Sequence, residues 1–182
     1  MGRPRSFDRD AALEEALLLF WARGYEQTSV ADLTRELGIS APSLYAAFGD
    51  KRTLFEEAVA RYEASPASVT TAGTAGGTPR QVLALMLDAA SREYADDAHP
   101  RGCLVNSSPE LAPARARNRA ITAARLEEVS DPDAERDGDP DAETLAAFVH
   151  VVLVGLSSYA RDGAGQERLR RVADLALRVV PT

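Results

Sequence analysis

Residues 28–51 read TSVADLTRELGISAPSLYAAFGDK, and their pattern sets the architecture of the N-terminal part of the chain. The first half of this stretch has apolar residues at helical spacing, which predict a short amphipathic helix: Val30, Leu33 and Leu37. Gly38 ends that helix, because glycine accepts the positive φ of a sharp turn. Ser40 can cap a second helix, and Pro42 is tolerated in its first turn because its missing N–H would be unpaired there. Two short helices joined in this way form a helix-turn-helix pattern.

The second helix of this pattern has the features of a helix that reads DNA. Its early residues carry short side chains that we expect to face outward, while Leu44 and Phe48 face inward. Ile39 is expected to fill the corner between the two helices. Such a helix fits the major groove, where base edges present a sequence-specific pattern of donors and acceptors. The stretch therefore predicts DNA binding.

Helical periodicity dominates the rest of the chain, and no strand pattern or internal repeat is evident. We expect further helices over 8–23, 51–64, 79–96, 114–129, 141–160 and 166–180, with a short helix at most within 97–113. Residues 65–78 carry no charge and little aliphatic content, so we predict a flexible linker. The predicted fold class is all-α, with about nine helices. Its parts are an N-terminal arm and helix-turn-helix domain (1–50), a connecting helix (51–64), the linker (65–78) and a larger helical domain (79–182).

Composition excludes several other classes of protein. With 45% apolar and 27% charged residues, the chain is neither collagen-like nor wholly disordered. One cysteine excludes an internal disulfide framework and a cysteine-based zinc site. The sequence shows no secretory signal, and its longest apolar stretch, 145–156, is too short to span a bilayer, so we expect a cytoplasmic protein with no membrane partner. The net charge of −7 excludes a uniformly basic coat, so DNA binding requires locally concentrated basic groups.

The segment 17–55 carries a longer set of residues that point to one family: Phe20, Gly24, Tyr25, Thr28, Val30, Leu33, Gly38, Ser40, Leu44, Tyr45, Phe48, Lys51 and Leu54. With these residues the segment resembles the DNA-binding domain of the TetR/AcrR family of bacterial transcriptional regulators. The resemblance implies a three-helix DNA-binding domain followed by a larger helical domain that binds an effector and dimerises through its last two long helices. The implied partners are a double-stranded DNA operator, a small-molecule effector of unknown identity and a second copy of the chain.

The resemblance also implies a set of DNA-contacting residues: Arg3, Arg5, Thr28, Ser29, Ser40, Ala41, Pro42, Ser43, Tyr45 and Lys51. Thr28 and Ser29 occupy positions where family members contact phosphate. Lys51 would hold a phosphate at the start of a helix, and the arginines of the arm could enter a minor groove. Many members have lysine at 41 and histidine and tyrosine at 46 and 47, whereas this chain has alanine at all three positions. Fewer side chains of this helix can therefore form hydrogen bonds with base edges.

The first 62 residues contain eight basic and ten acidic residues. DNA binding by this part of the chain therefore depends on where these charges lie in space. We expect the basic groups to cluster on the DNA side: Arg3, Arg5, Arg9, Lys51 and Arg52. We expect the acidic groups to face away from it: Glu14, Glu15, Glu56 and Glu57. This arrangement predicts a binding constant that falls steeply with salt.

Pairing of the last two helices from two chains would form a four-helix interface. The residues predicted to be buried in it are Leu145, Val149, Val152, Leu156, Leu169, Val172, Ala176 and Val179. A two-fold dimer would present two DNA-reading helices to a palindromic operator, at half-sites roughly 34–36 Å apart or multiples of this. We therefore predict a homodimeric regulator, most simply a repressor.

The effector site is placed in residues 79–182, with these candidate lining residues: Leu83, Met86, Leu87, Tyr94, Cys103 and Phe148. The alternative is that these residues form ordinary core. Cys103, after Arg101, could sense electrophiles or oxidants if the arginine favours its thiolate, or simply pack as a small buried residue. His150 could bind the effector or be a satisfied core or interface histidine. A thiol-based regulator thus remains one alternative, and a helical protein-interaction module without sequence-specific DNA binding is another.

No residue pattern indicates an enzyme, a cofactor or a metal site. The sequence lacks a nucleophile–base spacing and a phosphate-binding glycine loop. Residues 133–138 mimic the opening of a calcium loop, but Thr144 replaces the bidentate glutamate, so we predict a solvated acidic loop. His99, expected to be exposed, and His150 are far apart in sequence, so a metal site would have to rely on carboxylates.

Overall fold

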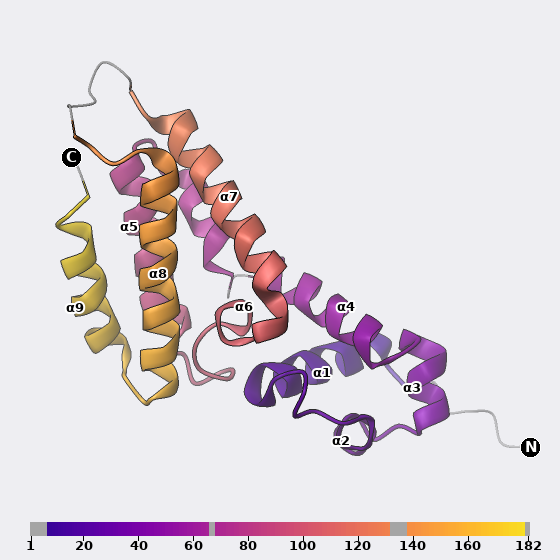
Figure 1. Cartoon of the computed structure of the whole chain (residues 1–182). Coiled ribbons are helices and arrows are strands. Elements are labelled where there is room, and N and C mark those ends of the chain that lie inside the picture. The colour runs from indigo at the N-terminus through magenta and orange to yellow at the C-terminus, as the bar shows by residue number, and fades with distance from the viewer. Residues whose placement is uncertain (1–6, 66–67, 132–137, 181–182) are drawn as a thin grey trace, which may run out of the picture. The chain divides into compact units, whose positions relative to one another are not determined.

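Four helices build the first part of the chain. The computed structural model describes residues 7–65, 68–131 and 138–180, and the chain divides into two units, Met1–Ser65 and Pro66–Thr182. The helices of the first unit are α1 (Arg9–Arg23), α2 (Val30–Glu36), α3 (Ala41–Phe48) and α4 (Lys51–Glu63) (Figure 1). These bounds lie within two residues of the predicted ones.

Each of these helices begins at a side chain that accepts a backbone N–H. Asp8 accepts from Asp10 and Ala11, Ser29 from Asp32, Ser40 from Ser43 and Asp50 from Thr53. A helix start has unsatisfied N–H donors, so a serine or aspartate at this position sets where the helix begins. This local chemistry explains why the boundaries were predictable from the sequence.

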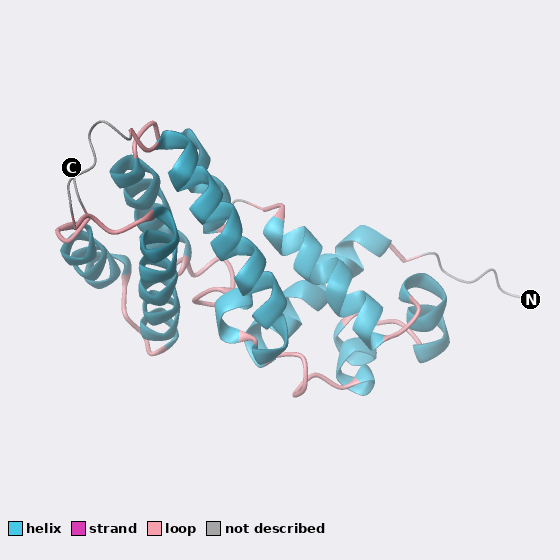
Figure 2. Ribbon diagram, turned by 45° about the horizontal axis from the view of Figure 1, so that its top comes forward, coloured by secondary structure: helices cyan, strands magenta, loops and turns pink. Residues whose placement is uncertain are grey.

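Aromatic contacts form the core of the first unit. Phe20 meets Phe55 edge-on with 5.1 Å between ring centroids, and Trp21 meets Tyr62 in the same way at 4.8 Å. Both contacts join α1 to α4, which lie side by side in Figures 1 and 2. The inward residues of α2 and α3 are buried against this pair, so those two short helices have defined inner and outer faces.

The second unit is a bundle of longer helices around α5. Its elements are η1 (Val69–Ala75), α5 (Pro79–Glu93), α6 (Leu104–Ser107), η2 (Pro109–Leu111), α7 (Ala112–Val129), α8 (Ala142–Arg161) and α9 (Gln166–Leu177). α5 contacts η1, α7, α8 and α9, while α8 also packs on α7 and α9. Figure 2 shows no strand among the described residues, which confirms the predicted all-α class.

The segment predicted as a flexible linker is partly ordered, and this corrects the prediction for 65–78. Residues Val69–Ala75 form the short helix η1, which packs on α5. Val69 is buried, and Gly73 lies so close to Val82 and Met86 that an added Cβ would come within 3.1 Å of each. A single apolar anchor and small neighbours allow this close packing, and composition alone could not reveal it.

The loop after α5 folds back onto α8. The amide of Gly102 donates to the carbonyl of Tyr94 (2.9 Å), and the amide of Cys103 donates to the hydroxyl of Ser157 (2.8 Å). Gly102 has φ +83°, and a Cβ there would lie 2.8 Å from the carbonyl oxygen of Ser157. Only glycine therefore fits this turn without strain. His99 lies inside the closed loop, so its side chain is only 15% exposed and the prediction of an exposed histidine was wrong.

Helix α8 is long and apolar. The helix has 20 residues, so it extends beyond the apolar stretch 145–156, and by length and composition alone it could cross a membrane. The same criterion is met by core helices of soluble proteins. Here α8 packs on α5, α7 and α9, yet only 33% of its most apolar 18-residue segment is buried within this chain. The remaining apolar face requires another explanation.

Candidate functional site

The turn between α2 and α3 has the predicted helix-turn-helix geometry. Gly38 adopts φ +61°, and the amide of Ile39 donates to the carbonyl of Thr34 (3.1 Å), which closes the turn. Leu33 on α2 and Leu44 on α3 are both fully buried. Because these two anchors set the rotation of each helix, the opposite face of α3 is directed to solvent.

The outward face of α3 consists of small side chains around one large one. Tyr45 is 47% exposed, and Pro42 and Ala46 are also exposed. Ser43 and Ala41 are half-buried, and the hydroxyls of Ser40 and Ser43 lie 2.9 Å apart. Tyr45 therefore offers the largest accessible polar group of this helix, and the serine pair is held at its N-terminus. The outward orientation of Pro42, Tyr45 and Ala46 agrees with the predicted helix rotation, and their contact with DNA stays a prediction.

The side chains of Thr28 and Ser29, two predicted phosphate contacts, form hydrogen bonds within their own chain. Thr28 is fully buried and its hydroxyl donates to the carbonyl of Gly24 (2.8 Å). Ser29 donates both its amide (3.1 Å) and its hydroxyl (2.5 Å) to Asp32. These bonds, together with an ion pair to Arg35, hold the pKa of Asp32 far below its usual range. The buried hydroxyl of Thr28 is therefore not accessible to a phosphate, which corrects its predicted role, whereas Ser29 starts α2 and is exposed, so its phosphate contact stays a prediction.

Lys51 lies over an aromatic ring at the start of α4. Its ammonium nitrogen is 4.1 Å from the centroid of Tyr25, whose ring packs on Phe55 at 4.8 Å. This cation–π contact restricts the lysine without neutralising its charge. The carboxylate of Asp50 already accepts the amide of Thr53 (2.7 Å), and this bond lowers the pKa of Asp50. The ammonium of Lys51 offers a positive charge at this helix start. It is positioned by Tyr25, a residue of the family pattern to which no part in DNA binding was assigned.

The basic and acidic groups of the first unit are paired rather than segregated, which corrects the predicted charge arrangement. Arg9 pairs with Glu57 at 2.6 Å, and Arg52 pairs with Glu56 at 2.6 Å. Arg9 also lies 4.6 Å from the centre of the Phe48 ring. Periodicity could not show the Arg9–Glu57 pair, because it joins separate helices, whereas the i,i+4 spacing of Arg52 and Glu56 on α4 is visible in the sequence. Arg3 and Arg5 lie outside the described residues.

The candidate effector residues divide between two places. Five of them are buried in the second unit: Leu83, Met86, Leu87, Tyr94 and Cys103. Burial, with the thiol of Cys103 nearby, raises the pKa of Tyr94 well above 10, so the phenol stays protonated. The amide of Asn106 donates to the Tyr94 oxygen at 3.4 Å. Phe148 instead lines a surface groove between α8 and α9, so the predicted set does not form one pocket.

That groove has a volume of about 350 Å³ and an almost entirely apolar lining: Phe148, Val152, Gly155, Leu156, Tyr159, Val172, Leu175, Ala176 and Val179. Of the predicted interface residues, Val152, Val172, Ala176 and Val179 lie in it and are accessible. Leu145, Val149 and Leu169 are buried within the chain, and Leu156 forms the floor of the groove while almost fully covered. Because α8 is apolar on most sides, its sequence could not show which side faces its own chain.

His150 lies half-buried on α8, beside α7. Burial and the positive charges of Arg119 and Arg115 lower the pKa of its imidazole. The histidine is therefore held neutral in the folded chain near pH 7.

A helix-turn-helix with an exposed, capped second helix and a positioned lysine defines the class of helix-turn-helix DNA-binding proteins. Residues 12–58 match the family described as "Bacterial regulatory proteins, tetR family". The chain is 33% identical to the HTH-type transcriptional repressor ComR of Escherichia coli (strain K12), over 99% of this chain and 92% of that protein. The chain belongs to the TetR family of transcriptional regulators.

Two further relatives extend this likeness. The HTH-type transcriptional repressor BdcR of Escherichia coli (strain K12) is 32% identical, over 100% of this chain and 93% of that protein. A cysteine mutant of the TetR family transcriptional regulator CifR, solved with 26bp double-strand operator DNA, has 38% identity and a TM-score of 0.87. That likeness covers 99% of this chain and 100% of the solved chain. The helix-turn-helix prediction and the family resemblance are thus confirmed.

Proposed function

We propose that this chain is a cytoplasmic, effector-responsive repressor that binds a palindromic operator as a homodimer. The observation that carries the proposal is the outward face of α3, where Tyr45 is accessible while Leu44 and Phe48 are buried. The similar proteins support it, since ComR and BdcR are named as repressors and the CifR mutant was solved with operator DNA.

In this proposal, α3 lies in the major groove. Ser43 and Tyr45 contact base edges or backbone, and the small side chains of Ala41 and Ala46 approach thymine methyl groups. The ammonium of Lys51 holds a phosphate and fixes the register of the helix. The surface ion pairs of Arg9 and Arg52 are individually weak, so an arriving phosphate can compete for the same guanidinium groups.

The groove between α8 and α9 supports the homodimer. Its accessible apolar residues would be costly to leave in water, and a second copy brings the same surface around a two-fold axis. The outward faces of α8 and α9 from two chains would then form a four-helix interface. Leu175 also lines the groove and is 62% exposed, and Val151 of the same helix α8 is exposed as well.

An effector in the second unit would act by shifting the equilibrium between two states of the dimer. It can change operator affinity only by its differential affinity for those states. The buried groups around α5, including Met86 and Tyr94, are candidates to open and admit it. The last helix of the first unit, α4, leads directly into the second unit along the chain, so it would transmit the change.

A gel-shift titration on the DNA upstream of the chain's own gene tests the proposal. We expect a specific shift at low salt that weakens steeply as salt rises. Lack of a specific shift at low salt would favour the protein-interaction module instead. Turnover of a small substrate would contradict both and indicate an enzyme.

The burial of Cys103 and one ion pair disfavour the thiol-sensor alternative. Cys103 is only 6% exposed, and Arg101, the residue expected to activate it, pairs with Asp97 at 2.8 Å. The decisive comparison is operator affinity before and after hypochlorite or a reactive aldehyde, in wild type and in Cys103→Ser. Equal responses of the two proteins would remove the sensor role, and a response absent only from the variant would establish it.

A further inference from the structure

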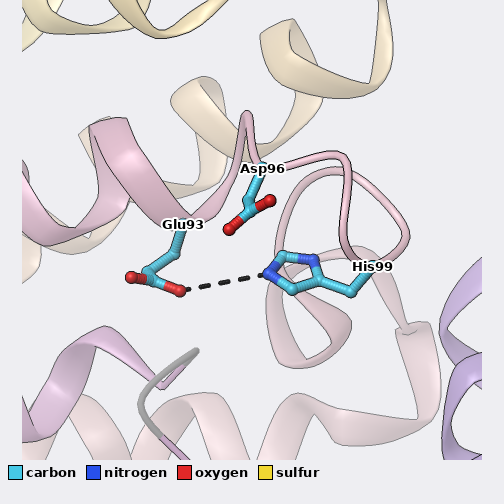
Figure 3. Close-up of side chains that lie close together, drawn as sticks. All are labelled: Glu93, Asp96 and His99. Atoms are coloured by element: carbon cyan, nitrogen blue, oxygen red, sulfur yellow. Dashed lines mark ion pairs between the residues drawn. The ribbon is translucent and has the colours of Figure 1, made fainter.

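Three potential metal ligands converge where α5 ends. Glu93 is the last residue of α5, Asp96 lies in the turn after it, and His99 lies in the loop that follows. One ligand atom from each residue lies within 4.8 Å of the other two, and Figure 3 shows their side chains directed toward a common point. The Nε2 atom of His99 is 4.0 Å from a carboxylate oxygen of Glu93.

The backbone explains why residues at a spacing of three come together. The amide of Asp96 donates to the carbonyl of Glu93 at 3.3 Å, so the chain continues α5 in a tighter turn. In such a turn, side chains three residues apart lie one above the other. One carboxylate oxygen of Asp96 accepts the amide of Ala98 (2.8 Å), which orients that carboxylate. The bond from Gly102 to Tyr94 closes the loop and brings His99 back to the same side.

A backbone carbonyl orients the ring of His99 so that Nε2 faces the two carboxylates. Its Nδ1 atom lies 3.1 Å from the carbonyl oxygen of Pro100, and a carbonyl can only accept, so Nδ1 carries the proton. Nε2 is the ring atom nearest Glu93, and a metal ion would bind there in place of a proton. Metal-binding histidines commonly donate their other N–H to a backbone carbonyl in this way, which fixes the ring orientation.

The charge around the three residues also favours a cation. The nearest arginines along the chain pair with other carboxylates, Arg92 with Asp88 and Arg101 with Asp97. Glu93 and Asp96 thus place two negative charges at the C-terminal end of α5, which is the negative end of the helix dipole. A divalent ion bound here would neutralise this charge.

We propose that Glu93, Asp96 and His99 form a binding site for a divalent first-row transition-metal ion of the Zn(II) class. One imidazole and two carboxylates suit Zn(II), with water in the remaining position, better than the all-oxygen preference of Mg(II). Ligand atoms around Zn(II) are about 3.4 Å apart, so side-chain adjustments of about 1 Å close the site. This proposal rests on the second unit alone and is independent of DNA binding.

Equilibrium dialysis of the full-length, metal-free chain against Zn(II) tests the proposal. We expect one ion per chain, and an affinity lower by roughly 100-fold or more in His99→Ala, since losing even an outer-shell partner costs 10–100-fold. Glu93→Gln and Asp96→Asn keep the side-chain shapes and are expected to weaken binding as well. Visible absorption of Co(II) in place of Zn(II) gives a second readout, and circular dichroism verifies that each variant is folded.

Matched controls come from the chain's other metal-binding residue types. His150→Ala removes the only other histidine, and Cys103→Ser removes the only thiol, so both are expected to bind Zn(II) as wild type does. Mg(II) at the same concentration is expected to remain unbound. The proposal is overturned if wild type binds no Zn(II), if His99→Ala binds it unchanged, or if Cys103→Ser abolishes binding.

Discussion

Replacing Leu175 tests the homodimer through a single accessible side chain. Leu175 lies in the groove between α8 and α9 and is 62% exposed in the single chain. Burying a whole leucine side chain is worth roughly 1.5–3 kcal/mol, so burying its exposed part contributes roughly 1–2 kcal/mol. A two-fold interface contains the residue twice, which brings the contribution to roughly 2–4 kcal/mol per dimer. Leu175→Ala is therefore expected to raise the dimer Kd by roughly 30- to 700-fold.

Sedimentation equilibrium over a wide concentration range, with fluorescence detection, measures this constant. Ile121→Ala is the matched control, because Ile121 is a large aliphatic residue on α7, is 48% exposed and lies outside the groove. We expect the control to dimerise as wild type does. Since Leu175 is mostly exposed in the single chain, the fold of the variant should be retained. An unchanged Kd for Leu175→Ala, or an equal loss in Ile121→Ala, would refute the placement of the interface on this groove.

Four other predictions follow from contacts in the two units. Tyr45→Ala is expected to weaken operator binding in gel shifts while Tyr45→Phe retains the ring contact; equal affinity of Tyr45→Ala and wild type would contradict the assignment of α3. Lys51→Gln should weaken binding similarly on all sequences and lower the salt slope by about one for each phosphate that the variant no longer holds, whereas an unchanged slope would show that no phosphate is bound there. Gly163→Ala, at φ +96° with open space around it, should cost roughly 1–2 kcal/mol in chemical denaturation, and Gly102→Ala at least about 1 kcal/mol more because its Cβ meets α8; equal costs would argue against that close contact. Because burial and two arginines of α7 lower the pKa of His150, the unfolded chain binds this proton at higher pH than the folded chain, so stability should fall as pH drops below about 6.5, and thermal melts of His150→Gln should show a smaller fall than wild type.

Local signals made the first unit predictable. Ser29, Ser40 and Asp50 start their helices through hydrogen bonds within three residues, and Gly38 turns the chain because of its own backbone freedom. Such interactions are set by neighbouring residues, so they are visible in the sequence. The outward position of Tyr45 followed from the same periodicity that placed Leu44 inside.

The error at Thr28, and the second role found for Ser29, have a different origin. The family resemblance assigned these residues to phosphate contact, but their hydroxyls bond to Gly24 and Asp32 of their own chain. A hydroxyl can form its hydrogen bond within its own chain or with a ligand, and the surrounding atoms determine which of these occurs. The sequence likewise could not reveal the ion pair between Arg9 and Glu57, because it joins α1 to α4 across 48 positions in the chain.

The amino-acid sequence by itself determined the all-α class, the helix starts, the helix-turn-helix and the membership of the TetR family, because these depend on short-range spacing and capping. Only the tertiary structure decided which apolar side of α8 is core and which lines the groove, that η1 packs on α5, and that Glu93, Asp96 and His99 meet. The sequence of a helix that is apolar on most sides does not indicate which neighbouring element packs on each side. That outcome depends on packing between segments distant along the chain, where close-packed side chains select one arrangement.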